Sequence, residues 1–171
     1  MEKLFFDKTG ETPLGKLWMA ASEQGLVAIE YGMDQTEFAA YLNKRFKCAA
    51  EKAPRRLREA VGQVEAYLTG RRREFSLAID WSIFTPFQQA ALRATCAIPC
   101  GETRTYHQIA EQIGRPRAAR AVGRAEATNP MPLVIPCHRV IGTDGRLHGY
   151  GMGEGLKTKA WLLKMEGAVM A

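Results

Sequence analysis

Short apolar runs separated by turn residues dominate the first 31 positions of the chain. Residues 3–7, 16–20 and 26–31 are rich in aromatic, aliphatic and β-branched side chains, and segments containing Pro or Gly lie between them. This pattern is typical of short strands joined by turns. We therefore expect a small antiparallel sheet at the start of the chain.

Apolar positions three or four residues apart predict helices over residues 36–46 and 57–68. Phe38, Leu42 and Phe46 recur four apart in the first segment, and four aliphatic residues follow a similar spacing in the second. Such a period places the apolar side chains on one face of a helix. Neither segment carries a recognisable chemical motif, so the first half of the chain offers no candidate site.

After about residue 80 the pattern changes to helices joined by turns rich in Pro and Gly. Thr85 and Pro86 are typical of a helix start, and the apolar stripe that follows predicts a helix up to about residue 97. The sequence therefore predicts an α+β protein with two domains, residues 1–82 and residues 83–171.

Two further segments predict a helix-turn-helix. Thr105 and Gln108 match a capping box, so a helix should begin at Tyr106. Gly114 closes this helix, and Pro116 is expected to open a second one that runs to about residue 125. Two short helices joined by a turn that contains Gly are typical of this module.

The second of these helices combines small and basic side chains. Arg117, Arg120 and Arg124 recur at helical spacing among alanines and a glycine. A thin surface with arginines suits close approach to DNA, and the scarcity of Asn, Gln and Ser favours the minor groove or recognition of shape. The alternative is that the alanines meet the core and the arginines are merely solvated.

Composition and charge narrow the class of protein. The chain has 171 residues, with 24 Lys and Arg against 18 Asp and Glu, and residues 81–171 hold eleven of the basic and six of the acidic side chains. This excess favours a polyanionic partner such as nucleic acid. No apolar run is long enough to span a membrane and the start does not read as a signal peptide, so we expect a cytoplasmic protein.

The four cysteines are expected to be free thiols, because nothing in the sequence indicates secretion. Cys96 and Cys100 are spaced like half of a zinc site, but a second pair is missing from the sequence. We therefore expect neither a metal ion nor another cofactor.

Cys137 lies in the most informative stretch, residues 129–141. Three prolines fix the chain on the way into this cysteine and make a central strand unsuitable. A nucleophilic cysteine needs a lowered pKa, which the neighbouring His138 and Arg139 could supply. Neighbours on a strand point to opposite faces, so a direct pair with His138 needs a turn or a bridging water. The alternative is a buried cysteine that packs as a small apolar side chain.

With the sequence Pro136-Cys137-His138-Arg139-Val140-Ile141, the chain resembles the methylated-DNA-protein-cysteine methyltransferases, also called O6-alkylguanine-DNA alkyltransferases. The resemblance runs over residues 84–167 and includes the helix-turn-helix. It implies that a ribonuclease H-like N-terminal domain precedes the helical domain. It also implies DNA repair by direct reversal: an alkyl group passes once and irreversibly from O6-alkylguanine, or O4-alkylthymine, to a cysteine after the nucleotide is flipped out of the duplex.

The resemblance also implies residue roles. Cys137 is the nucleophile, His138 accepts its proton through a water, and Glu166 orients His138. Asn129 orders the turn before the cysteine, and Tyr106 helps to rotate the nucleotide and donates to the leaving purine. The implied DNA contacts are Tyr106, Ala118, Ala119, Gly123 and Arg120, which fills the gap in the base stack. The implied base pocket contains Met131, Pro132, Val140, Tyr150 and Gly151, with the carbonyls of Cys137 and Val140 as acceptors.

The partner implied is double-stranded DNA, bound through the minor groove by a monomer. One segment departs from the family pattern: five residues, 151–155, separate Tyr150 from Leu156, where the family has three. This loop closes the base pocket, so its length leaves open whether the Gly151 amide donates to O6. Family members that only flag lesions lack the cysteine, and the presence of Cys137 argues against them.

Two other functions compete with repair. A helix-turn-helix regulator with a redox-sensing thiol would bind a defined operator and keep Cys137 reducible. A cysteine hydrolase would need turnover and an oxyanion hole, and the sequence shows no nucleophile elbow. Repair instead predicts a permanent adduct and little sequence preference.

Overall fold

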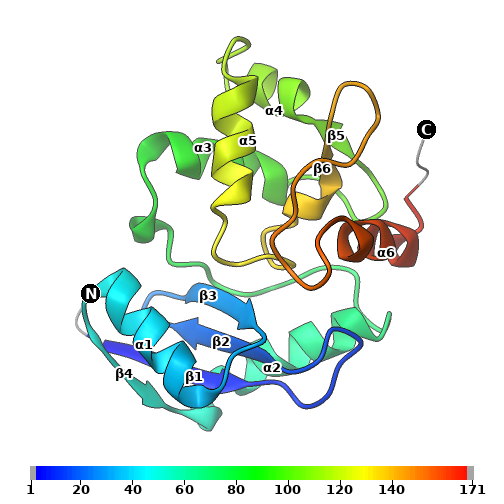
Figure 1. Ribbon diagram of the computed structural model, residues 1–171. Coiled ribbons are helices and arrows are strands. Elements are labelled where there is room, and N and C mark those ends of the chain that lie inside the picture. Colours follow the sequence, from blue (N-terminus) through cyan, green and yellow to red (C-terminus); the bar gives the residue numbers. More distant parts are fainter. Residues whose placement is uncertain (1–2, 169–171) are drawn as a thin grey trace. The chain divides into compact units, whose positions relative to one another are not determined.

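The computed structural model describes residues 3–168, and the chain forms two compact units (Figure 1). One unit ends at Asp80 and the other begins at Trp81, so the short 3₁₀ helix Trp81–Ile83 falls in the second unit. The sequence predicts this boundary two residues later. A small sheet in the first unit and mainly helices in the second confirm the α+β class.

The sheet of the first unit contains the three predicted strands and one more. Strands β1 (Lys3–Lys8), β2 (Leu17–Ala21) and β3 (Leu26–Tyr31) pair antiparallel in sequence order. Strand β4 (Ala49–Lys52) pairs parallel to β1, giving the order β3-β2-β1-β4. The antiparallel pairing of the three expected strands is confirmed, and the parallel edge strand β4 is one that the sequence analysis did not predict. The sequence of β4 is Ala-Ala-Glu-Lys and its side chains are mostly exposed, so it carries no apolar alternation that could be recognised.

Both predicted helices of the first unit are present. Helix α1 (Gln35–Phe46) begins with a capping box formed by Asp34 and Glu37. Helix α2 (Pro54–Leu68) begins three residues before the predicted start, because Pro54 occupies its first turn, where a missing amide costs nothing. Their buried faces pack with the strands around Phe38, Leu42 and Leu57.

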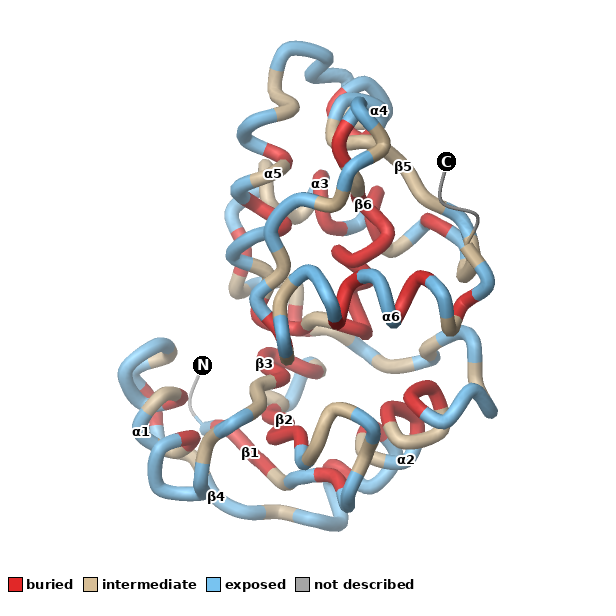
Figure 2. The backbone as a smooth tube through the Cα atoms, turned by 45° about the vertical axis from the view of Figure 1, so that its right-hand side comes forward, coloured by how far each residue is buried: buried red, intermediate tan, exposed pale blue. Residues whose placement is uncertain are grey.

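The second unit consists mainly of helices α3 (Pro86–Cys96), α4 (Tyr106–Gln112), α5 (Ala119–Ala127) and α6 (Leu156–Glu166). Strands β5 (Arg104–Thr105) and β6 (Val140–Ile141) form a short parallel pair. Helices α3, α4 and α5 pack on one another around a core that includes Ile98, Ile109 and Val122. Figure 2 shows buried positions gathered around β6 and the segment that precedes it.

The predicted helix-turn-helix is present as α4 and α5, with one correction. Helices begin after Thr85 and Thr105 as the sequence predicts, and both starts are capping boxes, although the sequence analysis identifies the box only at Thr105. Helix α5, however, begins at Ala119 and not at Pro116. The Ala118 amide donates to the Arg115 carbonyl at 2.8 Å, which closes a turn with Pro116 at its second position, a place that its fixed φ favours. Arg117 therefore lies in the turn before α5 and not on the helix.

None of the helices within residues 3–168 combines the length and the apolar composition that a membrane span requires.

Candidate active site

Cys137 opens a short 3₁₀ helix, η2 (Cys137–Arg139), which leads directly into β6. Before it, the Ile135 amide donates to the Met131 carbonyl at 2.9 Å, so the proline-rich segment folds back on itself. The chain therefore enters the cysteine through a turn, as the prolines predict. The turn lets the adjacent side chains of His138 and Arg139 reach the same carboxylate, that of Glu166, whereas neighbours on a strand would point to opposite faces.

Asn129 ties the end of α5 to this turn. Its Nδ2 donates to the Ile135 carbonyl at 3.0 Å and to Cys137 Sγ at 3.3 Å, and its Oδ1 accepts from the Met131 amide at 2.9 Å. Its own amide donates to the Glu126 carbonyl at 3.2 Å. Asn129 therefore fixes the position of the sulfur relative to the second helix of the helix-turn-helix.

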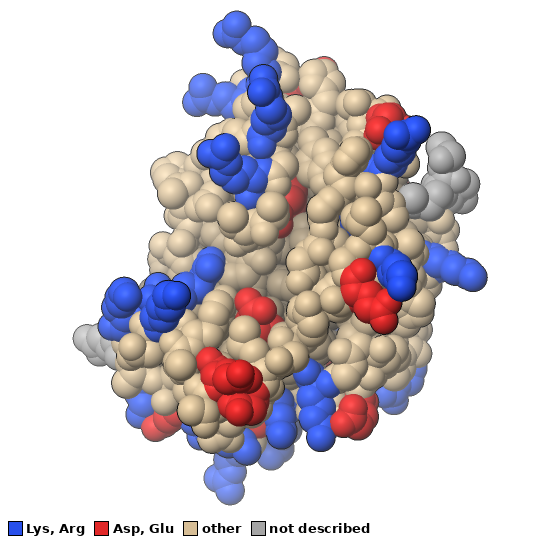
Figure 3. Space-filling model, viewed as in Figure 1, with Lys and Arg blue, Asp and Glu red and all other residues tan. Residues whose placement is uncertain are grey.

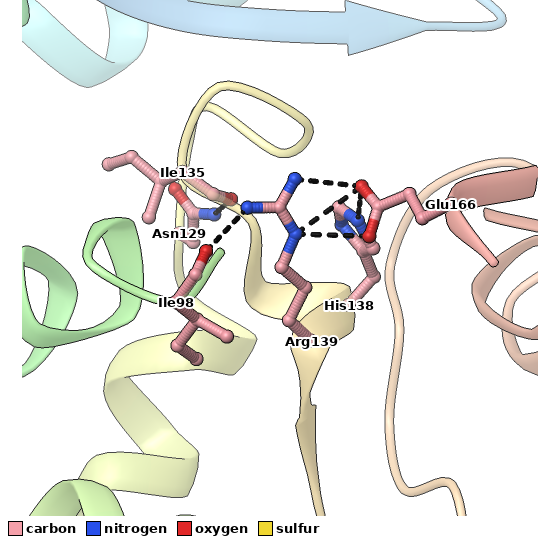
Figure 4. A network of polar contacts seen from close by, with 6 residues as sticks. All are labelled: Ile98, Asn129, Ile135, His138, Arg139 and Glu166. Atoms are coloured by element: carbon pink, nitrogen blue, oxygen red, sulfur yellow. Dashed lines mark hydrogen bonds and ion pairs between the residues drawn. The ribbon is translucent and has the colours of Figure 1, made fainter. Parts of the chain in front are cut away.

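The side chain of Glu166 on α6 receives both of the other side chains of η2 (Figure 4). His138 Nε2 lies 2.9 Å from Oε1, and the Arg139 guanidinium contacts the carboxylate at 2.8 and 3.0 Å. Arg139 also donates to the Ile98 carbonyl at 2.7 Å. All three side chains are buried, so a complete ion pair with an attached imidazole lies inside the unit.

Burial sets the ionisation of His138 and Cys137. Burial lowers the pKa of His138, and the opposing effect of Glu166 is smaller. The imidazole is therefore favoured in its neutral form at neutral pH. The pKa of the Cys137 thiol is raised to about 12, first by burial and then by the charge of Glu126. The expectation that His138 and Arg139 lower this pKa is therefore wrong. The charge of Arg139 is directed to Glu166, and the groups that favour the thiolate are Asn129 and Lys159.

Lys159 is a charged residue beside the candidate site that the sequence analysis missed. It is fully buried, and its Nζ donates to the Val140 carbonyl at 2.7 Å and to the His148 carbonyl at 2.8 Å. Burial lowers its pKa to about 8, while Cys137 and Glu126 act in the opposite direction. The available signal was its spacing, because Lys159 precedes Glu166 by two helical turns and so shares its face of α6.

The Val140 carbonyl, expected to accept from a bound base, thus already accepts from Lys159. The Cys137 carbonyl likewise accepts from the Val140 amide at the end of η2. A carbonyl has two lone pairs, so each can take a second donor.

A pocket of about 570 Å³ lies beside α5. Four of the predicted DNA-contact residues line it, and the remaining lining comes from His107, Ala127 and the segment that follows β6. Those four are Tyr106, Ala119, Arg120 and Gly123. Ala118 is the residue that caps α5.

The predicted base-pocket residues are not among those that line this cavity. Met131 and Val140 are fully buried, and Val140 belongs to the helical core. The ring of Tyr150 lies edge-on to the ring of His138, with 6.4 Å between centroids. Pro132 and Gly151 are also absent from the lining, and so is Cys137. Tyr106 nevertheless connects the sulfur to the pocket. It lines the pocket, and the charge of Cys137 contributes to its raised pKa.

The long loop after Tyr150 forms a turn that caps α6. Met152 points inward and is 2% exposed, while Gly151 and Glu154 are exposed. The Glu154 amide donates to Thr158 Oγ1 at 2.8 Å, and Gly155 adopts a positive φ of 62° at the start of the helix. Residues 151–155 therefore form the turn that leads into α6, and Gly151 is not among the residues that line the pocket of about 570 Å³.

Basic side chains surround the predicted DNA-binding helix. Arg117, Arg120 and Arg124 are exposed, and Figure 3 shows Lys and Arg side chains projecting from the region of α5. Arg120 also lines a second pocket of about 500 Å³ between the start of α3 and α5. All four cysteines are free thiols, and residues 3–168 contain no group of three side chains suited to a metal ion.

Comparisons with known proteins agree with the sequence motif. Residues 6–81 match the ribonuclease-like domain of 6-O-methylguanine DNA methyltransferase, and residues 86–168 match its DNA binding domain. A methylated-DNA–protein-cysteine methyltransferase of Methanosarcina barkeri is 44% identical over 160 residues, which cover 91% of this chain and 93% of that protein.

Solved structures show the same similarity. The O6-methylguanine methyltransferase of Mycobacterium tuberculosis matches with a TM-score of 0.77 and 36% identity, covering 96% of this chain and 93% of that one. A complex of the Mycobacterium tuberculosis protein with DNA matches with a TM-score of 0.76 and 35% identity, covering 96% and 92%. The chain therefore belongs to the 6-O-methylguanine DNA methyltransferase family, the family that its Pro-Cys-His-Arg motif indicates.

Proposed function

We propose that the protein repairs DNA by transferring the alkyl group of O6-alkylguanine to Cys137, once per chain. The observation that carries this proposal is the arrangement around η2. Asn129 Nδ2 lies 3.3 Å from the Cys137 sulfur, and the imidazole of the next residue, His138, lies 2.9 Å from the Glu166 carboxylate. This arrangement supplies a positioned thiol and, on the next residue, an imidazole base that is held by a third group.

The chemistry needs no cofactor. The Sγ–C bond forms while the C–O6 bond breaks, and the electron pair of the broken bond stays on the guanine. The thiol proton passes through a water to His138, whose Nδ1 is the acceptor nitrogen when Nε2 donates to Glu166. The product is a thioether, which thiol exchange does not reverse, so each chain acts once. O4-alkylthymine presents an equivalent carbon and is included as a substrate.

Reaching that carbon requires the nucleotide to leave the base stack, because the alkyl group lies at a base edge inside the duplex. The small residues Ala118, Ala119 and Gly123 allow α5 to approach the minor groove closely. Arg120 fills the gap left in the stack, and Tyr106 helps to rotate the nucleotide and donates a hydrogen bond to the leaving purine. These assignments are supported by the pocket beside α5, which Arg120 and Tyr106 both line.

The base-pocket residues enter the proposal with modified roles. Tyr150 packs near His138 and is suited to cover the flipped base, with Pro132 and Gly151 at the margin. Met131 and Val140 support the reactive turn from the core. We propose a monomer acting in the cytoplasm, since four free cysteines suit a reducing compartment.

The test compares Cys137→Ser with Cys100→Ser in transfer from an oligonucleotide that carries labelled O6-methylguanine. The Cys137→Ser variant should take up no label and keep most of its DNA affinity, measured by fluorescence anisotropy. The Cys100→Ser variant should behave like the parent protein. Full label uptake by Cys137→Ser would remove this residue as the acceptor.

A further inference from the structure

Glu126 is a buried carboxyl group that the proposed reaction does not use. It lies on α5, is 6% exposed, and accepts from Thr95 Oγ1 on α3 at 2.6 Å through Oε1. Its other oxygen, Oε2, is buried and has no hydrogen-bond partner among residues 3–168. Burying a carboxylate that has one oxygen without a hydrogen bond costs free energy. The burial therefore favours the protonated form of Glu126 over the ionised form.

The surroundings of Glu126 connect it to the reactive cysteine. Its backbone carbonyl accepts from the amide of Asn129, whose side chain donates to Cys137 Sγ. Ionisable groups from each packed element interact with its charge. These groups are Cys96 on α3, Tyr106 on α4, Cys137 on η2 and Lys159 on α6.

Two potential anions in this space, Glu126 and Cys137, therefore share one cation, Lys159. The positive charge of Lys159 favours the carboxylate and also favours the thiolate, while a Glu126 carboxylate opposes the thiolate. Two negative charges in one buried space are unfavourable, so loss of the thiol proton is easiest while Glu126 is protonated.

We propose that Glu126 is a positioning residue that sets the charge state of Cys137: while ionised it holds the sulfur as a thiol, and on taking up a proton it leaves Lys159 to stabilise the thiolate. Where alkyl transfer is concerned, this inference rests on the proposed function. No new covalent step is involved, and the thiol proton still leaves by way of His138.

Glu126 should change its charge, and with it the charge state of Cys137, near neutral pH. Burial raises the pKa of Glu126 to about 7, against the opposing effects of Thr95 and Lys159. Below that pH the carboxyl group is neutral, and the thiolate fraction should rise with pH in the ordinary way. Above it, each gain in thiolate is offset by the new charge on Glu126. A plot of log rate against pH should therefore flatten near pH 7.

The experiment measures how fast iodoacetamide alkylates Cys137, by peptide mass mapping, in the full chain between about pH 5 and about pH 9, where thiolate reactivity reports the ionised fraction. The parent protein should show the flat region. Glu126→Gln retains an acceptor for Thr95 and removes the charge. It should match the parent below about pH 6, show no flat region near pH 7 and be about tenfold faster at about pH 8. Loss of the Lys159 charge at higher pH should affect both proteins alike. Glu102→Gln removes an exposed charge and should keep the parent profile.

Equal rates for the parent and Glu126→Gln at about pH 8, or a straight parent profile, would overturn the inference. Glu126→Met removes the charge without an amide and should reproduce the Gln profile, which separates charge from hydrogen bonding. The alkylation measurement needs no DNA. Failure of methyl transfer from an oligonucleotide would count against the proposed function alone, and an unchanged alkylation profile would count against Glu126 alone.

Discussion

The helical unit contains two buried glutamates in contrasting surroundings. Glu166 is 2% exposed and meets a guanidinium and an imidazole, whereas Glu126 is 6% exposed and accepts from one neutral hydroxyl group. The first carboxylate is engaged by both of these partners and can orient them. The second has a pKa raised to about 7 and can change its charge under ordinary conditions. Burial alone therefore does not decide what an acidic side chain does, because its partners decide whether it stays ionised.

The largest effect is expected from removing the paired carboxylate. Glu166→Ala leaves the Arg139 charge buried without its anion, so the free energy of unfolding should fall by about 3–5 kcal/mol in urea titrations. Glu166→Gln keeps an acceptor and should lose less. A loss below about 1 kcal/mol for the alanine variant would show that Arg139 finds another anion or water.

The unpaired carboxyl group predicts a pH dependence of stability. The pKa of Glu126 is raised from 4.5 to about 7. Its contribution to the free energy of unfolding is therefore fully present below about pH 4.5 and is lost as pH rises through about 7. At about pH 8 the parent protein should have lost about 3 kcal/mol from this group, and Glu126→Gln should not show that decline. Urea titrations of both proteins across this range measure the difference. Parallel curves would contradict the assignment.

A smaller effect is expected at Thr95, the only hydrogen-bond donor to the Glu126 carboxylate within residues 3–168. Thr95→Val preserves the shape of the side chain and should cost about 2 kcal/mol at about pH 8, where the acceptor is charged, and about 1 kcal/mol at about pH 5. Thr128→Val removes an exposed hydroxyl that bonds to the Arg124 carbonyl and serves as the control. A cost for Thr95→Val that is independent of pH would indicate that the carboxyl group does not titrate in this range.

Local signals account for what the sequence predicts well. The Thr85–Pro86 pair and the capping box at Thr105 place two helix starts correctly, because each is decided by residues at most three positions apart. Pro116 shows the limit of this reasoning, since proline suits both a first helical turn and the second position of a β-turn. Strand β4 is held by pairing with β1, which its own polar sequence does not reveal.

The site depends on contacts between residues that are distant in sequence. Arg139 and Glu166 are 27 positions apart, and Thr95 and Glu126 are 31 apart. Spacing cannot reveal such pairs, and the role of Glu166 entered through the family resemblance. The pKa of Cys137 was predicted in the wrong direction for the same reason. The adjacent Arg139 could be read from the sequence, whereas its engagement by Glu166 and the burial of the sulfur could not.

The most direct test of the account is the intact mass of the parent protein after mixing with a duplex that carries one O6-methylguanine, followed by peptide mapping. The account predicts one added methyl group per chain, located on the peptide that contains Cys137, with no further uptake when more duplex is added. An unchanged mass, a methyl group on another residue, or repeated turnover by one chain would contradict it.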